Sequence, residues 1–393
     1  MRVRRITRFT HVLAIVALIA GFPACDNALN EFVSVLSGDD TPQLTRLSGE
    51  IPIGVVLALT GQFDSGVGIP MQQGFELARE EINNAQLGSA RLTFITEDTR
   101  SESAIDAFNK LIDEDGVPII IGLAISTQAA KAFPIAQENG VVAFSPVSAA
   151  SGLSALGDFL FRAALTTDVL ISRGVEATQE KLGYKKVAII YDASDLYSRS
   201  SNAAAQTAFT AKGIEVLTTE SVLGGETDFT EQLTKIKALN PDAIFISVLP
   251  SRMPQVMIQA RQLGIPTSVP FIGPQFSIEQ VRAAGPVADG VITFISWSSV
   301  SPTPGNQDFV QNYSRKYGAA PNAWAAQSYA TLYILAEAMA KAGSTDSTAI
   351  RDALANVMDF PTILGQFSFN SVGDAIYDPK ILIVKEGQFE VFE

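Results

Sequence analysis

Short apolar segments alternate with longer amphipathic segments along most of the chain. The short segments are rich in Val and Ile and lack polar alternation, which is typical of strands covered on both faces. They predict strands at 53–59, 91–96, 118–122, 141–145, 186–191, 214–219, 243–248, 270–272 and 290–295. The longer segments predict helices at 70–86, 102–113, 126–138, 169–182, 196–212, 229–239, 253–263 and 306–317. Alternating strands and helices predict an α/β fold with parallel sheets and right-handed crossovers.

The order of these elements repeats within the chain. The strand, helix and strand between 53 and 96 are echoed between 186 and 219. Each stretch resembles the opening of a doubly wound unit, so we expect two similar lobes. The tail differs, because its short strands at 366–369, 380–384 and 388–392 are separated by Gly-containing turns that predict antiparallel hairpins.

Ligands of open α/β sheets bind beyond the carboxyl ends of the strands. The loops that follow the predicted strands are therefore the candidate site. They lie at 61–70, 123–127, 146–151, 192–197, 249–253 and 273–277.

The first 24 residues predict a secretory signal. Four Arg residues precede an apolar run at 12–22, which is too short to span a bilayer, and Ala24 then precedes Cys25. The spacing resembles a bacterial lipoprotein signal, in which the Cys becomes the lipidated first residue. An ordinary cleaved signal with an incidental Cys is the alternative. Residues 25–49 are polar and lack a clear period, so we interpret them as a tether.

Composition narrows the possible chemistry. The chain has 393 residues, one Cys and one His, and the His is His11 within the predicted signal. A mature chain without imidazole would exclude His-based triads and general bases, and a single Cys excludes internal disulfides. We therefore predict no metal site and no cofactor. Removal of the signal, with four Arg and no acid, would change the formal net charge from −13 to −17. This acidity argues against nucleic-acid binding.

Hydroxyl-bearing loops follow two neighbouring predicted strands. Ser126 and Thr127 begin a helix, where their hydroxyls and the free backbone N–H groups could hold a carboxylate, although both residues are also ordinary helix caps. Segment 145–149 follows the next strand in the same way. The loop at 60–68 contains no nucleotide-binding glycine motif. The carboxylates at 80–81 and 113–115 are interpreted as solvated helix faces.

Several segments together resemble the type I periplasmic solute-binding proteins, and within them the leucine/isoleucine/valine-binding branch of ABC importers. The resemblance covers about 50–393. The segments are Ile53-Gly54-Val55-Val56 with Leu59-Thr60-Gly61, the helix from Gly74 to Asn83, Ile121-Gly122 with Ser126-Thr127-Gln128, Phe144 to Ala149, Tyr313 with Tyr317-Gly318, and Ala342 to Asp346.

This resemblance implies two Rossmann-like lobes with parallel central sheets, joined by three crossover strands near 165–170, 296–300 and 372–378. Lobe 1 would comprise 50–167 plus 298–373, and lobe 2 would comprise 168–297 plus 374–393. The ligand-binding residues implied by position are Gly68, Ser126 or Thr127, Val147, Ser148 and Ala149 in lobe 1, Tyr197, Leu249 and Gln275 in lobe 2, and Trp324 over the ligand's side chain.

Two positions depart from the amino-acid-binding pattern that the resemblance implies. Ala149 stands where a Thr or Ser hydroxyl is usual, and Gln275 stands where an acid is usual. A neutral amide lacks the charge-assisted bond that a buried ammonium needs, at a cost of a few kcal/mol. The sequence therefore leaves open an amide, a carboxylate without an amine, or another small ligand.

The leading hypothesis is an extracytoplasmic substrate-binding protein of an ABC importer, anchored to a membrane through lipidated Cys25. It would be a monomer that closes on a small-molecule ligand and docks on a membrane permease. A ligand-sensing lipoprotein that signals to a membrane receptor is the alternative, and an enzyme is a third possibility.

Overall fold

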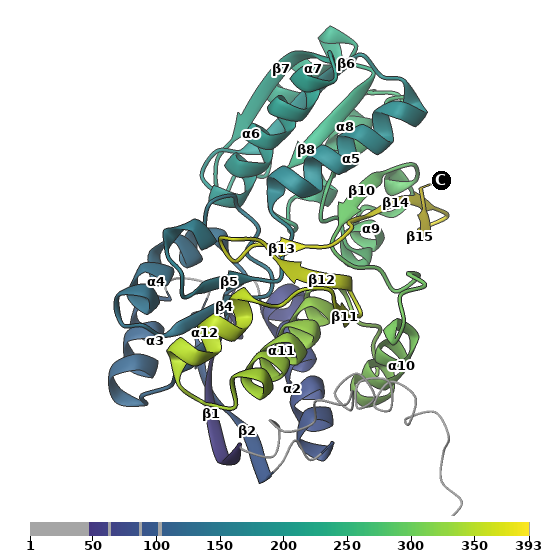
Figure 1. Ribbon diagram of the computed structural model, residues 1–393. Coiled ribbons are helices and arrows are strands. Elements are labelled where there is room, and N and C mark those ends of the chain that lie inside the picture. The colour runs from purple at the N-terminus through teal and green to yellow at the C-terminus, as the bar shows by residue number, and fades with distance from the viewer. Residues whose placement is uncertain (1–46, 62–63, 86–88, 101–103, 393) are drawn as a thin grey trace, which may run out of the picture.

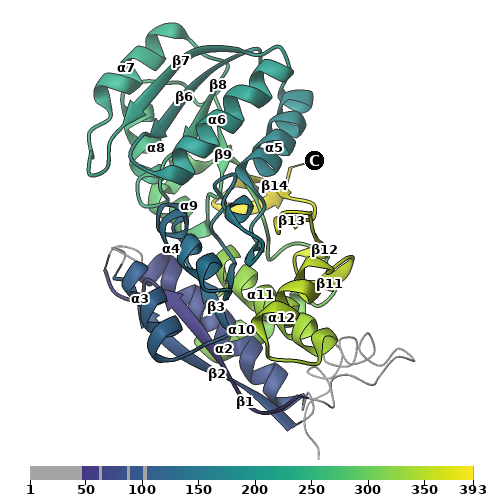
Figure 2. The ribbon, with the colours of Figure 1, turned by 60° about the vertical axis from the view of Figure 1, so that its left-hand side comes forward.

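The computed structural model describes residues 47–392 except 62–63, 86–88 and 101–103. The predicted signal, the lipidation residue Cys25 and nearly all of the predicted tether lie outside the described residues. The described chain forms two α/β lobes that meet along a central seam (Figures 1 and 2).

Lobe 1 is built on a five-stranded sheet with the order β2-β1-β3-β4-β5, in which every neighbouring pair is parallel. Its strands are β1 (Ser48–Leu57), β2 (Ser89–Asp98), β3 (Ile119–Gly122), β4 (Val142–Ser145) and β5 (Leu160–Arg162). Its helices are α2 (Ile69–Asn84), α3 (Ile105–Asn109), α4 (Ser126–Glu138), α10 (Asn306–Tyr317), α11 (Ala323–Ala342) and α12 (Ser347–Ala355).

Lobe 2 is built on a seven-stranded sheet with the order β15-β14-β10-β9-β8-β6-β7. Its strands are β6 (Lys186–Asp192), β7 (Glu215–Val222), β8 (Ala243–Ser247), β9 (Phe271–Pro274), β10 (Ile292–Ile295), β14 (Lys380–Lys385) and β15 (Gln388–Val391). Its helices are α5 (Thr167–Leu182), α6 (Leu196–Ala211), α7 (Thr230–Leu239), α8 (Met253–Gln262) and α9 (Ile278–Ala284). The C-terminal strands β14 and β15 add to this sheet antiparallel, as the tail pattern predicted.

The chain passes between the two sheets after β5, after β10 and before β14. A small antiparallel sheet of β11 (Phe360–Thr362), β12 (Gly365–Phe369) and β13 (Ala375–Ile376) lies at the third passage. A hydrogen bond links the first and third passages: the Tyr377 hydroxyl donates to the Ala163 carbonyl at 2.9 Å. Two lobes with three connections confirm the fold class that the sequence predicted.

Helix α11 is absent from the set of helices that the alternation predicted. Its lack of a polar face explains why, since 16 of its 20 residues are buried and the helix shows no amphipathic stripe. It packs closely against α2, where a Cβ on Gly74 would lie 2.2 Å from the Ala325 carbonyl oxygen. This close contact places the N-terminal turn of α11, with Trp324, at the seam between the lobes.

The predicted helix at 102–113 is interrupted. The structure has the short α3 followed by a π-helical segment, Lys110–Glu114. Among the described residues, no helix is both long and apolar enough to cross a membrane.

Candidate ligand-binding cleft

A small pocket of about 70 Å³ lies where loops of the two lobes face each other. Its walls come from the loops after β3 and β4 and the start of α11 in lobe 1, and from the loops after β6, β8 and β9 in lobe 2. The lining residues are Val67, Ala124, Ile125, Ser126, Val147, Ala149, Asp195, Tyr197, Leu249, Pro250, Gln275 and Trp324. The carboxyl ends of parallel strands thus form the pocket, as expected for open α/β sheets.

Seven of the residues that the resemblance implied line this pocket: Ser126, Val147, Ala149, Tyr197, Leu249, Gln275 and Trp324. The other three, Gly68, Thr127 and Ser148, lie close to it in the chain but do not line it. Their contacts explain why.

Gly68 packs against the backbone, since a Cβ there would lie 1.7 Å from the Ala58 carbonyl oxygen. Ser148 is fully buried and donates from its hydroxyl to the Leu123 carbonyl at 3.0 Å, so it braces the loop after β4. Thr127 reaches across the seam: its hydroxyl accepts from the Leu196 N–H at 3.2 Å and donates to the Asp195 carboxylate at 3.4 Å. Thr127 therefore connects the lobes directly.

The lobe 1 side of the pocket offers hydrogen-bond donors. Helix α4 begins at the pocket wall without a side-chain cap, so no side chain satisfies its first N–H groups, and the positive end of its dipole lies at this wall. The Ser126 hydroxyl accepts from the Ala150 N–H at 3.2 Å, which leaves its proton available. The Ala149 N–H donates to no acceptor within the described part of the chain. This side is suited to a carboxylate or another anionic group.

The lobe 2 side carries a carboxylate that the sequence interpretation missed. Asp195 is 6% exposed, caps α6 by accepting from the Ser198 N–H at 2.8 Å, and lines the pocket. Burial raises the pKa of its carboxyl above the usual value, and the nearby Asp192 adds to the rise. An Asp directly before a predicted helix is an ordinary capping signal, so no local pattern distinguishes Asp195 from other helix caps.

Tyr197 and Gln275 complete the lobe 2 wall. Burial raises the pKa of Tyr197, which therefore stays a neutral hydroxyl at physiological pH, and that hydroxyl has no hydrogen-bond partner of acceptable geometry among the described residues. Gln275 adopts a positive φ of 63°, a conformation that costs a non-Gly residue energy. Two hydrogen bonds hold this segment: the Gln275 N–H donates to the Phe294 carbonyl, and the neighbouring Phe276 N–H donates to the Thr293 hydroxyl, each at 3.0 Å.

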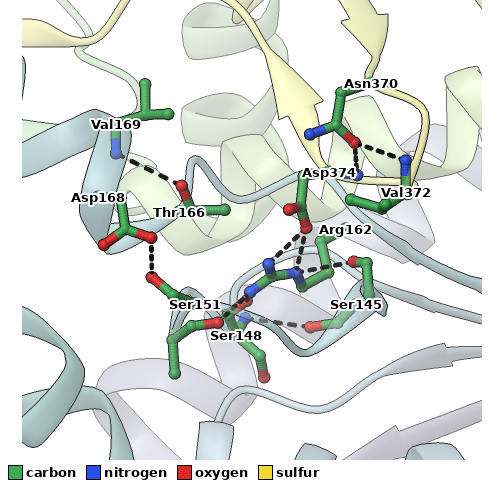
Figure 3. Close-up of polar contacts among 12 residues, drawn as sticks. Ser145, Ser148, Ser151, Arg162, Thr166, Asp168, Val169, Asn370, Val372 and Asp374 are labelled. Atoms are coloured by element: carbon green, nitrogen blue, oxygen red, sulfur yellow. Dashed lines mark hydrogen bonds and ion pairs between the residues drawn. The ribbon is translucent and has the colours of Figure 1, made fainter. Parts of the chain in front are cut away.

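A buried arginine organises the loop after β4 (Figure 3). Arg162, at the end of β5, is fully buried and donates to the carbonyls of Ser148 and Ala150 on either side of Ala149. It also forms an ion pair with Asp374 in the third passage between the lobes. The pocket loop and the hinge region are therefore joined through one guanidinium group.

Trp297 and Glu81 do not line the pocket, and their side chains form hydrogen bonds elsewhere. Trp297 donates from its indole N–H to the Asn306 side chain at 2.6 Å in the second passage, outside the pocket. The expectation of a solvated face at 80–81 fits Glu80, whose side chain is 48% exposed, but it is wrong for Glu81. The Glu81 carboxylate accepts from the hydroxyls of Tyr329 and Tyr333 on α11.

Two lobes with mainly parallel sheets, three connections and a pocket between the carboxyl ends of their parallel strands define a two-lobed solute-binding protein. Comparison with known proteins gives the family: residues 50–381 match the model of a periplasmic binding protein family, and the chain belongs to that family.

Relatives with known roles support this class. The chain is 25% identical over 332 residues to the Leu/Ile/Val-binding protein homolog 3 of Brucella melitensis, covering 83% of this chain and 88% of the relative. It is 26% identical to a leucine-binding protein of Thermotoga maritima, with a TM-score of 0.79 over 87% of this chain and 98% of the other. It is also 26% identical to the branched-chain amino acid transporter substrate-binding protein of Streptococcus pneumoniae in complex with isoleucine, with a TM-score of 0.80 and the same coverage of both chains. The protein is thus an extracytoplasmic substrate-binding protein of the ABC-transporter class.

Proposed function

We propose that the protein binds a small apolar amino acid, or a close zwitterionic relative, between its two lobes and delivers it to an ABC permease. The observation that carries this proposal is the opposition of two charge preferences across one pocket. The uncapped N-terminus of α4 and Ser126 lie on one side, and the buried carboxylate of Asp195 lies on the other. A zwitterion satisfies both sides at once.

Asp195 alters the expectation, drawn from the neutral Gln275, that the ligand has no amine. The sequence has no acid at 275, which disfavoured a ligand with an amine. Asp195 offers the missing charge from a different loop, and within the described part of the chain its Oδ1 accepts only the 3.4 Å bond from the Thr127 hydroxyl. Because no Lys or Arg among the described residues forms an ion pair with this buried carboxylate, a ligand ammonium would compensate for its lost hydration.

The remaining walls favour an apolar side chain. Val67, Val147 and Leu249 line the pocket together with Trp324, which is 6% exposed. Two of the relatives named above are described as binding leucine or isoleucine, and this wall is compatible with ligands of that kind.

Calorimetry with L-leucine and 4-methylpentanoate, which lacks only the amine, tests this proposal. Asp195→Asn is expected to weaken leucine binding by roughly 10- to 150-fold, the equivalent of about 1.5–3 kcal/mol for a charged hydrogen bond, and to leave 4-methylpentanoate binding unchanged. Gln275→Glu is the matched variant in the same pocket. A gain in leucine affinity with Gln275→Glu, combined with no loss in Asp195→Asn, would show that residue 275 faces the amine and would refute the role of Asp195.

We also propose that Cys25 is lipidated and holds the protein at a membrane. The support is the basic, apolar and small-residue order of the first 25 residues. In a bacterial host, radiolabelled palmitate is expected to enter the wild-type chain but not Cys25→Ser. Equal release of both proteins into the soluble fraction would refute the anchor.

Transport is favoured over sensing because the named relatives are described as binding proteins and one as a transporter component.

We propose that the protein does not transform its ligand. The support is that the named relatives are described as binding proteins. Recovery of the ligand unchanged after prolonged incubation is the expected result, and a product detected by mass spectrometry would contradict it.

A further inference from the structure

A second and much larger cavity, of about 800 Å³, lies away from the pocket and shares no lining residue with it. Walls come from α2, α10, α11 and the β11–β12 hairpin of lobe 1, from the second passage at 298–305, and from the start of β14 and the end of β15 in lobe 2. Figure 1 shows β14 and β15 above, β11 and β12 between, and α10 below on this side of the molecule. The volume is within the range of about 300–1,000 Å³ that is usual for small-molecule sites.

Most of the lining is apolar and part of it is aromatic. Phe309, Tyr329 and Tyr333 form a continuous wall, with ring centroids 4.7 Å apart for Phe309 and Tyr329 and 4.8 Å apart for Tyr329 and Tyr333. Phe392 contributes a further ring from the lobe 2 side. Faces of such rings attract an organic cation.

Glu81 places a negative charge in this cavity. Its Oε2 accepts from the hydroxyls of Tyr329 at 2.5 Å and Tyr333 at 2.8 Å, and its Oε1 accepts from the Asn312 amide at 3.2 Å. All three donors are neutral, and no Lys or Arg of the described chain forms an ion pair with Glu81. Burial keeps the pKa of both tyrosines well above the usual value, so their hydroxyls remain neutral donors to the Glu81 carboxylate.

The other charged groups of the lining do not cancel this preference. They are Asp308 on α10 and Lys380 at the start of β14, so the lining carries two carboxylates and one ammonium. An anionic ligand would be repelled by two carboxylates and attracted by only one ammonium of this lining. A cation with an apolar body matches both the carboxylate and the rings.

We propose that this cavity is a second ligand site, selective for a small organic amine with an apolar or aromatic body. Its ammonium would pair with Glu81, and its body would pack on Phe309 and the tyrosines. Because both lobes line the cavity, an occupant would favour the lobe arrangements that keep these walls around it. The cavity and the cleft would then be coupled, with an effect that is reciprocal by linkage. Only this coupling rests on the proposed function of the cleft.

Calorimetry with 2-phenylethylamine tests the site without using any cleft ligand. Matched probes are 2-phenylethanol, which is neutral, and 3-phenylpropionate, which is anionic. We expect the amine to bind at least tenfold more tightly than either probe, and Glu81→Gln to remove that preference. Glu80→Gln is the control, because Glu80 is one residue away, exposed, and paired with Lys316. Equal binding of all three probes, or unchanged selectivity in Glu81→Gln, would overturn the proposal.

Two further variants locate the bound amine and guard against misfolding. Val391→Trp narrows the cavity from the lobe 2 side at a position that is 53% exposed, so the fold is expected to be retained and amine binding reduced. Trp324→Ala in the cleft is expected to leave amine binding unchanged. Loss of amine binding in Trp324→Ala, with none in Val391→Trp, would assign the amine to the cleft and refute the second site.

Discussion

At the scale of single residues, Asp195 combines a structural role with the proposed ligand-binding role. It caps α6 through the Ser198 N–H and faces the pocket while nearly fully buried. The burial that raises its pKa is unfavourable for the folded protein when the carboxylate is ionised. A ligand of the opposite charge therefore binds such a site with a more favourable free energy than it would bind a site whose charge is already paired.

Asp195→Asn is expected to raise the melting temperature of the unliganded protein at neutral pH. The folded-state pKa lies above that of the unfolded chain, so the stabilisation linked to protonation is present below the unfolded pKa and is lost as pH rises through the folded pKa. Asn keeps an oxygen that can cap the helix. Thermal unfolding of both proteins across pH measures this difference. A lower melting temperature for the variant at neutral pH would contradict it.

The same pKa shift predicts a pH dependence of binding. The ammonium of leucine needs an ionised Asp195, so affinity is expected to fall as pH decreases through the raised pKa, at a higher pH than for an ordinary Asp. Asp195→Asn should remove this dependence. Leucine titrations at several pH values test it, and an identical pH profile in both proteins would exclude Asp195 as its source.

At the scale of elements, strands and helices were largely predictable because each has a local pattern. The predicted helices at 126–138 and 306–317 coincide with α4 and α10. Two elements without a distinctive local period were absent from the prediction: β5 has three residues, and α11 is buried on all sides. The short helices α9 and α12 were absent as well. The link between β5 and the third passage, Arg162 to Asp374, spans 212 residues and depends on tertiary packing.

Arg162→Met is expected to destabilise the fold by about 3–5 kcal/mol, because it leaves the Asp374 carboxylate buried without its partner. It also removes donors from the carbonyls on both sides of Ala149, so ligand affinity should fall. Urea unfolding measures the first effect. Arg351→Met is the control, since its partner Asp158 is 64% exposed and such surface pairs contribute about 0–1 kcal/mol. Equal losses of unfolding free energy in the two variants would show that the buried ion pair contributes no more to stability than the exposed one.

Replacing both members of the pair adds a second check. Arg162→Met with Asp374→Leu should recover part of the stability, because neither charge then remains unpaired. Strictly additive losses would mean that the pair is not coupled.

At the scale of the whole molecule, the lobes are held together by direct contacts as well as by the three passages. Thr127 bonds to the N-terminus of α6, and the Ser151 N–H donates to the Ser200 hydroxyl at 2.9 Å. These bonds connect the two sides of the cleft without a ligand. Their strength sets how much a ligand must add to keep the cleft narrow.

Thr127→Val is expected to shift the unliganded protein towards a more open arrangement while keeping side-chain volume. Small-angle X-ray scattering should give a larger radius of gyration without leucine and an unchanged one at saturation, with leucine affinity reduced by about 2- to 12-fold per lost hydrogen bond. Thr207→Val, whose exposed hydroxyl bonds within its own helix, is the control. Identical scattering of both variants and the wild type would show that Thr127 does not bias closure.

The sequence by itself determined the α/β class, the two similar lobes and the loops in which a site had to lie. These follow from residue periodicity and from strand direction, which are local properties. It also indicated seven of the residues that line the pocket. Only the tertiary structure decided which side chains of those loops face one another: Asp195 turns into the pocket, Thr127 joins the lobes, and Glu81 points to two tyrosines about 250 residues away. Such pairings depend on how separately formed elements pack, and no local pattern in the chain records that packing.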